Sequence, residues 1–151
     1  MLQLRHPVSF VNSWVALGFF TNPERHPLSA FALRFFELSG DPVEDALHWW
    51  LHWNRWAMES AHAVYGLESW SPDLLERLLK LVGVNDATQR AEQAFTSVGT
   101  EVNSAKEKGY RPLELTWTDI PDSSVKVQAA LAAEQWGYDV YDPSQSPKVR
   151  L

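Results

Sequence analysis

The sequence predicts a mainly α-helical protein, a single-domain bundle of about five or six helices around a long central helix at about residues 42–65. Three observations support this fold class. Prolines and glycines stand where helices begin and end, the apolar residues between them recur at helical spacing, and 45% hydrophobic with 21% charged residues is the composition of a globular chain. At 151 residues the chain has the usual length of one domain, which we expect at 1–142, followed by an extended C-terminal tail at 143–151.

Two aromatic-rich segments, 9–20 and 27–38, precede the central helix and are predicted to form short helices. We expect their rings to pack against the central helix in one dense core. The rings belong to Phe10, Trp14, Phe19, Phe20, Phe31, Phe35 and Phe36.

The central helix has a start signal and a stop signal. Asp41 stands at the N-cap, Pro42 follows at the first helical position, and Glu44 has the spacing of a capping-box acid that bonds back to the cap. Gly66 follows Tyr65 and fits the left-handed position just past a helix end. The sequence therefore predicts a helix roughly 36 Å long, at 1.5 Å per residue.

Three further helices are expected after the central helix, each followed by a glycine. Ser71 is the expected cap of the first helix, and Asn85 or Asp86 that of the second. The expected helices and the glycines that end them are about 72–82 with Gly83, about 87–108 with Gly109, and about 123–136 with Gly137.

Two segments have strand-like patterns. Residues 113–118 alternate apolar and polar side chains with β-favouring residues and stop before Pro121, and residues 138–141 form a second short run. The two could pair as a short two-stranded β element. Such an isolated ribbon is marginal in water unless helices pack on it.

Four tryptophans and two histidines are interleaved in the run HWWLHWNRW at 48–56. At roughly 100° per residue, a helix places the four indoles on one side and a polar stripe on the other. The indoles are those of Trp49, Trp50, Trp53 and Trp56. The stripe consists of Glu44, His48, His52, Arg55, Glu59 and His62.

The indole face has two interpretations. Aromatic stripes at helical spacing usually pack inward as core. Four buried indole N–H groups are nevertheless hard to satisfy in a domain of this size, and tryptophan is enriched among interface hot spots. Part of the face could therefore meet a partner chain, with Trp49, Trp53 and Trp56 as the candidate partner-binding residues and with Trp56 and Trp49 expected to be the most exposed.

The polar stripe also has two interpretations. His48 and His52, one helical turn apart, together with Glu59 and His62 at the Glu-x-x-His spacing, could bind zinc, iron or manganese. A complete site would need a ligand from another helix, for which His26 is the remaining candidate histidine. The alternative is a solvated face on which neighbouring charges pair weakly, at about 0.2–0.5 kcal/mol per pair.

Charge and motifs exclude several classes of function. The net charge is −6 with no run of lysine and arginine, which argues against direct nucleic-acid binding. The longest uncharged stretch, 7–23, is too short and too polar to span a membrane. The chain has no cysteine, no phosphate-binding glycine loop and no Gly-x-Ser-x-Gly turn, so no active site is recognisable.

These features favour a small acidic cytoplasmic protein that binds another protein or itself and is not an enzyme. Such a module would serve as an accessory subunit, an assembly factor or an inhibitor or immunity-type partner. The alternative from another class is a metal-binding protein or metal-dependent enzyme that uses the His/Glu stripe of the central helix.

Overall fold

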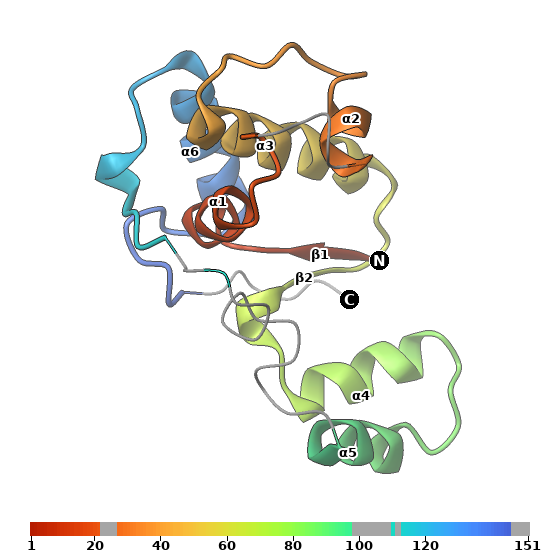
Figure 1. The fold of residues 1–151 in the computed structure, drawn as a ribbon. Helices are drawn as coiled ribbons and strands as arrows, with labels where there is room; N and C mark the ends of the chain where they lie inside the picture. Colours follow the sequence, from red (N-terminus) through yellow and green to blue (C-terminus); the bar gives the residue numbers. More distant parts are fainter. Residues whose placement is uncertain (22–26, 98–109, 111–112, 146–151) are drawn as a thin grey trace.

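The computed structural model describes residues 1–21, 27–97, 110 and 113–145 (Figure 1). Within these residues the fold is mainly α-helical with a small β element, so the predicted fold class is confirmed. In chain order the helices and strands are β1 (Leu2–Leu4), α1 (Pro7–Ala16), α2 (Pro27–Ala32), α3 (Pro42–Ser60), β2 (Val64–Gly66), α4 (Pro72–Leu81), α5 (Ala87–Ser97) and α6 (Ser124–Trp136). Two short 3₁₀ turns are η2 (Leu67–Ser69) and η3 (Trp117–Asp119).

Helix α3 lies at the centre of the larger part of the molecule. Helices α1 and α6 both pack against it, and β1 runs beside it. Helices α4 and α5 pack against each other and project away from the other helices (Figure 1). Within the described ranges, no helix combines the length and the hydropathy needed to cross a lipid bilayer.

Helix α3 starts after its predicted N-cap, Asp41. The acid whose side chain bonds back to the residues before the helix is not the predicted one. Asp41 Oδ1 accepts from the backbone N–H groups of Val43 at 2.8 Å and Glu44 at 3.3 Å. The Asp41 N–H donates to Ser39 Oγ, so the predicted capping box with Glu44 is wrong. The carboxylate that reaches back is that of Asp45, whose Oδ1 accepts from Ser39 N at 2.7 Å.

The end of α3 is not where the sequence places it. The helix stops at Ser60, because Ala61 is already extended, and Val64–Gly66 forms β2 instead of a last helical turn. Strand β2 pairs in parallel with β1, and Gly66 lies opposite Leu4 with an ordinary φ of −81°. The predicted left-handed Gly66 is therefore wrong, since a pairing with the distant N-terminus overrides the local stop signal.

The two segments predicted as strands are not strands. Residues 113–116 and 138–139 have no regular secondary structure, 117–119 form η3, and 140–141 lie in a turn closed by the Asp142 N–H, which donates to Asp139 O at 3.1 Å. The side chain of Asn12 replaces a neighbouring strand: its Nδ2 donates to Leu115 O at 2.9 Å and its Oδ1 accepts from Leu115 N at 3.0 Å. The alternating pattern therefore marks an extended segment. The backbone groups of Leu115 in this segment bond to the side-chain amide of Asn12 and not to a neighbouring strand.

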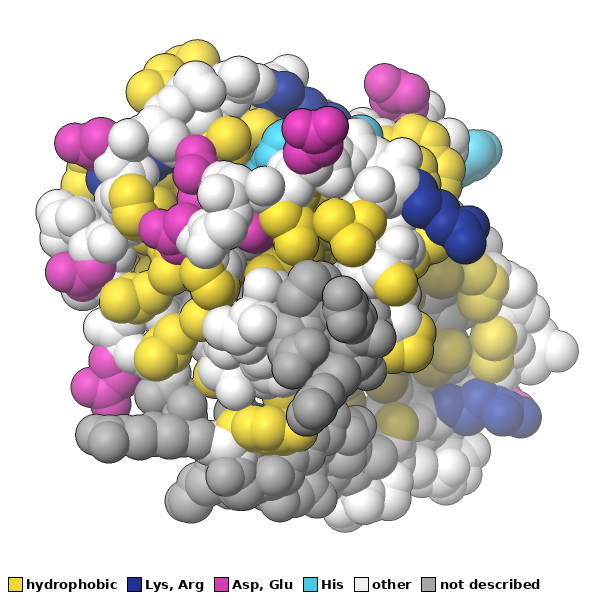
Figure 2. Space-filling model, turned by 45° about the horizontal axis from the view of Figure 1, so that its top comes forward, with side chains coloured by type: hydrophobic (Ala, Val, Ile, Leu, Met, Phe, Trp, Pro, Cys, Tyr) yellow, Lys and Arg dark blue, Asp and Glu magenta, His cyan; other side chains and the backbone are white. Residues whose placement is uncertain are grey.

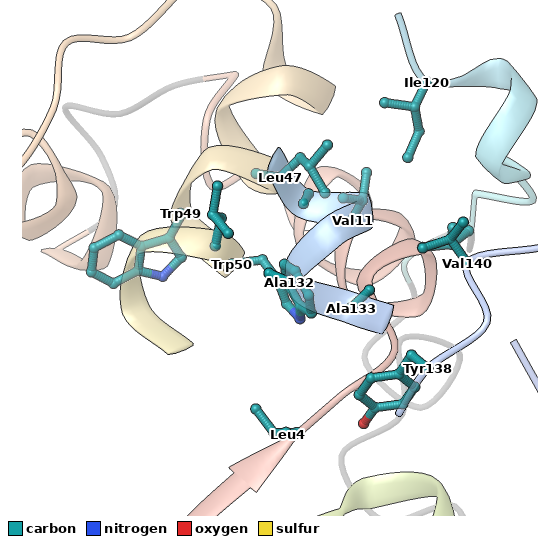
Figure 3. Close-up of a cluster of buried hydrophobic side chains, with 14 of the residues drawn as sticks. Leu4, Val11, Leu47, Trp49, Trp50, Ile120, Ala132, Ala133, Tyr138 and Val140 are labelled. Atoms are coloured by element: carbon teal, nitrogen blue, oxygen red, sulfur yellow. The ribbon is translucent and has the colours of Figure 1, made fainter. Parts of the chain in front are cut away.

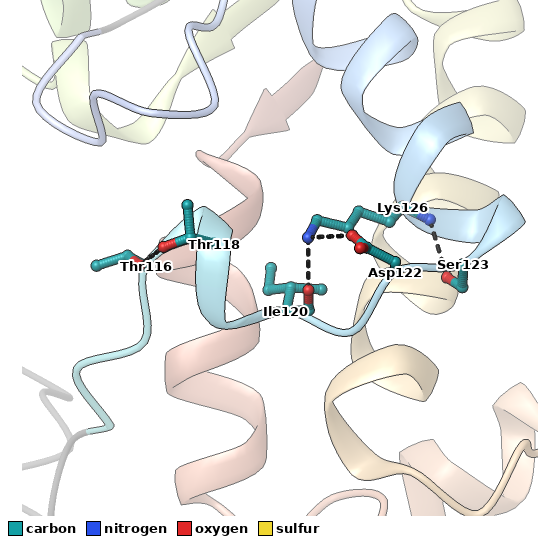
Figure 4. Close-up of polar contacts among 6 residues, drawn as sticks. All are labelled: Thr116, Thr118, Ile120, Asp122, Ser123 and Lys126. Carbon is teal, nitrogen blue, oxygen red and sulfur yellow. Dashed lines mark hydrogen bonds and ion pairs between the residues drawn. The ribbon is translucent and has the colours of Figure 1, made fainter.

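Helix α6 begins after a compact set of polar contacts (Figure 4). Ser123 caps it by accepting from Lys126 N at 3.2 Å, and Lys126 Nζ donates to Ile120 O at 2.6 Å and Asp122 Oδ1 at 2.9 Å. The helix ends at Gly137 with a φ of 88°, the left-handed conformation that glycine adopts without strain. Both predicted boundaries of this helix are thus confirmed to within a residue.

The remaining predicted helices are all present, and some of them are shorter than predicted. Helix α4 matches its prediction and ends before Gly83, which has a φ of 77°. Helices α1 and α2 end at Ala16 and Ala32, earlier than expected. The predicted helix after Asn85 is confirmed through Ser97, and its remainder lies outside the described residues.

The hydrophobic core lies between α1, α3, α6 and the turn that follows α6 (Figure 3). Trp50 is its largest fully buried side chain, with an exposed fraction of 1%. Its indole Nε1 donates to Arg5 O at 2.8 Å, so the one polar atom of the ring is satisfied. The alanine-rich face of α6 lets this helix approach α3 closely.

Replacing Asp41 with alanine should lower the free energy of unfolding by about 1 kcal/mol, because two backbone N–H groups at the start of α3 lose their acceptor. Urea denaturation measures this loss. Asp73→Ala is the matched control: Asp73 is an exposed acid in the first turn of α4, whose cap is Ser71, and its loss should cost about 0.3 kcal/mol. Equal losses in the two variants would contradict the assigned cap.

Candidate functional site

The four indoles of α3 divide into two buried and two exposed rings. Trp49 and Trp50 are 4% and 1% exposed, whereas Trp53 and Trp56 are 38% and 57% exposed. The expectation that Trp56 reaches solvent is confirmed, and the same expectation for Trp49 is wrong. One helix face therefore serves both as core and as surface.

Trp49 is buried because rings from the two preceding helices cover it. Phe31 of α2 meets it edge-on with ring centroids 6.1 Å apart, and Trp14 of α1 lies at 6.4 Å. Phe36, in the segment between α2 and α3, lies at 6.3 Å on another side. The aromatic-rich N-terminal helices were predicted to join this core, and their contacts remove Trp49 from the surface.

Three exposed rings are linked by contacts with one another or with buried Trp49. We call them the aromatic patch and define it as Phe35, Trp53 and Trp56. The Trp53 and Trp56 rings lie 5.3 Å apart in an edge-to-face arrangement. Buried Trp49 joins the patch from below, at 5.4 Å from Trp53 and 6.2 Å from Phe35. On the face turned halfway from the front toward the top of Figure 1, hydrophobic side chains reach the surface at several places between charged ones (Figure 2).

A cavity of about 390 Å³ lies beside this patch, between α1, α2, α3 and β1. We call it the aromatic cavity. Its lining residues are Gln3, Leu4, Arg5, Phe10, Trp14, Leu28, Phe31, Trp49, Trp50, Trp53, Asn54 and Leu67. Trp53 belongs to both the cavity and the patch, so the two features share one wall.

Asn54 is a cavity residue that the sequence analysis overlooked. Its side chain is only 5% exposed, and it makes no side-chain hydrogen bond to any residue in the described part of the chain. A signal was present in the sequence: in helical projection, this amide falls between Trp50 and Leu47 on the apolar side of the helix. A polar side chain at a buried position usually has a hydrogen-bond partner, so the lack of one at Asn54 calls for an explanation.

The histidines of the predicted polar stripe pack against rings. His48 lies 4.2 Å from Phe36 and His52 lies 5.3 Å from Phe35, measured between ring centroids. Further along the stripe, Arg55 Nη1 donates to Gln128 Oε1 of α6 at 3.1 Å. His48 and His52 thus pack against aromatic rings, whereas Arg55, Glu59 and His62 are exposed, so the stripe is only partly a solvated face.

The predicted metal ligands do not converge in the structure. His62 lies beyond the end of α3, where its Nδ1 is 3.2 Å from Ser60 O, so Glu59 and His62 do not have the helical spacing that the prediction assumed. Across residues 1–21, 27–97, 110 and 113–145, no three His, Cys, Asp or Glu side chains are grouped so that they could hold a metal ion. His26 lies outside the described residues.

The pKa of His48 is shifted in the folded protein. Burial against Phe36 lowers the pKa of His48 below its ordinary value of 6.5, and the neighbouring His52 lowers it further. The carboxylates of Asp45 and Glu44 oppose this shift. The neutral imidazole is therefore the form that the folded protein favours.

Comparisons with protein-family models, with curated proteins and with solved structures find no match to this chain. No activity or partner is therefore transferred from a relative. A proposal about function therefore rests on the geometry of the aromatic patch and the aromatic cavity.

The stability of the protein should fall as the pH drops below about 6.5 and should be restored above it, because the unfolded chain binds the His48 proton more readily than the folded chain. Urea denaturation at about pH 7.5 and pH 5.5 measures this difference. His48→Gln should reduce the fall, whereas His62→Gln, at an exposed histidine, should leave it unchanged. The same fall in all three proteins would assign it to other groups.

Proposed function

We propose that this protein is a small acidic protein-interaction module and that the aromatic patch is its partner-binding surface. The single observation that carries the proposal is the exposure of Trp53 and Trp56, side by side on a helix whose other two tryptophans are fixed in the core. A module of this kind acts as an accessory subunit, an assembly factor or an inhibitor or immunity-type partner.

Rigid exposed indoles are well suited to binding a protein. Trp53 is held between Trp49 and Trp56, so these rings lose little conformational freedom when a partner covers them. Tryptophan is among the residues that contribute most to binding at interface centres. In the unbound protein the same rings expose apolar surface to water, at a cost of about 25 cal/mol for each Å² left uncovered.

The charge of the chain bears on which partner fits. A net charge of −6 attracts basic proteins over distances of about a Debye length and repels acidic ones. We therefore propose a basic or neutral partner chain, with association between two copies opposed by their like charge. The lack of cysteine in all 151 residues fits a reducing compartment, and we propose that the protein acts in the cytoplasm.

Replacing Trp56 with alanine should weaken a complex that co-purifies with the protein by about 2 kcal/mol, or roughly 30-fold, while the isolated chain stays folded. Trp70→Ala is the matched control, because Trp70 is 41% exposed but stacks on Phe95, away from the patch. Quantitative co-purification, with circular dichroism as the test of folding, separates the two variants. If they retain the same partners equally well, the patch is not the binding surface.

A further inference from the structure

The aromatic cavity has the features of a small-molecule site, and it shares only Trp53 with the aromatic patch. We infer that it binds a flat aromatic carboxylic acid, with the ring among the indoles and the carboxyl group on the side chain of Asn54. This inference does not depend on the proposed protein partner, because the head-group contacts that carry it, at Asn54 and Arg5, lie outside the patch.

The walls of the cavity are mainly aromatic and are held in place by ring contacts. Phe10 stacks on Trp14 with centroids 4.6 Å apart, Trp14 contacts Trp49, and Trp49 contacts Trp53. Because each ring is supported by another, the walls cannot readily collapse to fill the space. A volume of about 390 Å³ lies within the range of ligand pockets, roughly 300–1,000 Å³, and flat rings are the shape that indole faces stack against.

Asn54 supplies the hydrogen-bonding group in this apolar setting. The whole residue is 5% exposed, and its amide has no hydrogen-bond partner in the described part of the chain. Neither amide atom is among the fully buried atoms without a partner, so the amide is open to water or to a ligand in the cavity. A ligand head group that accepts from the Asn54 amide would take the place of water there and add a hydrogen bond within an otherwise apolar wall.

Charge at the same wall favours an anionic head group over a cationic one. Arg5 lines the cavity and is only partly exposed, and none of the described acids forms an ion pair with it within 4.0 Å. Burial lowers the pKa of Arg5, while Glu68 acts in the opposite direction. A partly buried cation with no ion pair inside 4.0 Å repels an ammonium and attracts a carboxylate, even though Glu68 offsets part of its charge.

Three probes with one ring system test these requirements by titration calorimetry on the whole chain: 2-naphthoate, naphthalene and 2-naphthylmethylammonium. We expect 2-naphthoate to bind at least tenfold more tightly than either of the others, because it alone combines the ring with a hydrogen-bond-accepting anion. No binding of 2-naphthoate, or tightest binding of the ammonium compound, would overturn the inference.

Asn54→Leu separates the head-group contact from the ring contacts. This variant should bind 2-naphthoate about tenfold more weakly, bind naphthalene as well as the unaltered protein does, and unfold at an equal or higher urea concentration. Unchanged 2-naphthoate affinity in a folded Asn54→Leu variant would contradict the role of the amide. Trp70→Ala is the control, since Trp70 stacks on Phe95 outside the cavity and its loss should leave 2-naphthoate binding intact.

A spectroscopic measurement on the unaltered protein keeps the inference testable even if Asn54→Leu does not fold. Addition of 2-naphthoate should shift the indole N–H resonances of Trp14, Trp49 and Trp53, which line the cavity, and leave that of Trp70 in place. Shifts confined to Trp56 and Trp70 would place the probe on the surface and overturn the inference. Failure of the proposed partner binding, tested through Trp56, would leave this result unaffected.

Discussion

The hydrogen bond from the indole of Trp50 to the backbone carbonyl of Arg5 is the contact on which the arrangement of the fold depends. A tryptophan that is 1% exposed needs an acceptor for its N–H, and this one finds it 45 residues earlier in the chain. The bond ties the middle of α3 to the junction of β1 and α1. At that junction His6 N also donates to Glu68 Oε1 at 2.8 Å, and His6 Nε2 lies 2.8 Å from Asp139 O.

This junction decides which part of α3 is covered. Once β1 and α1 are fixed beside Trp50, the rings of α1 and α2 reach as far as Trp49 but leave Trp53 and Trp56 partly open. The aromatic patch is therefore the uncovered continuation of the core. The aromatic cavity lies where the covering helices end, with buried Asn54 in its wall. Both candidate functions arise from one incompletely covered helix.

Local signals in the sequence predict the fold class and several element boundaries. The caps at Asp41 and Ser71 depend only on neighbouring backbone, as does the helix end at Gly137, and all three are found as expected. The pairing of β1 with β2 joins segments about 60 residues apart, so no local pattern contains it. Extended residues near Leu115 bond to the side chain of Asn12 instead of to a strand.

The candidate site is less predictable than the fold, because helical projection shows which way a side chain points but not whether other residues cover it. Projection places the indoles and the histidines on different faces, yet the Trp49 and His52 rings lie 6.4 Å apart in the structure. Projection also cannot say that Phe31 and Trp14 cover Trp49 while Trp56 stays 57% exposed. Similarly, the predicted metal stripe assumed that α3 continues to His62, and the strand pairing that ends α3 at Ser60 removes that geometry.

Hydrogen exchange of the indole N–H groups, followed by NMR in deuterated water, tests the division of α3 most directly. The indole of Trp50 should exchange slowly, near the rate set by global unfolding, because it is buried and bonded to Arg5. Those of Trp53 and Trp56 should exchange before the first spectrum is recorded. Fast exchange at Trp50, or equal protection of all three indoles, would contradict a helix that is half core and half binding surface.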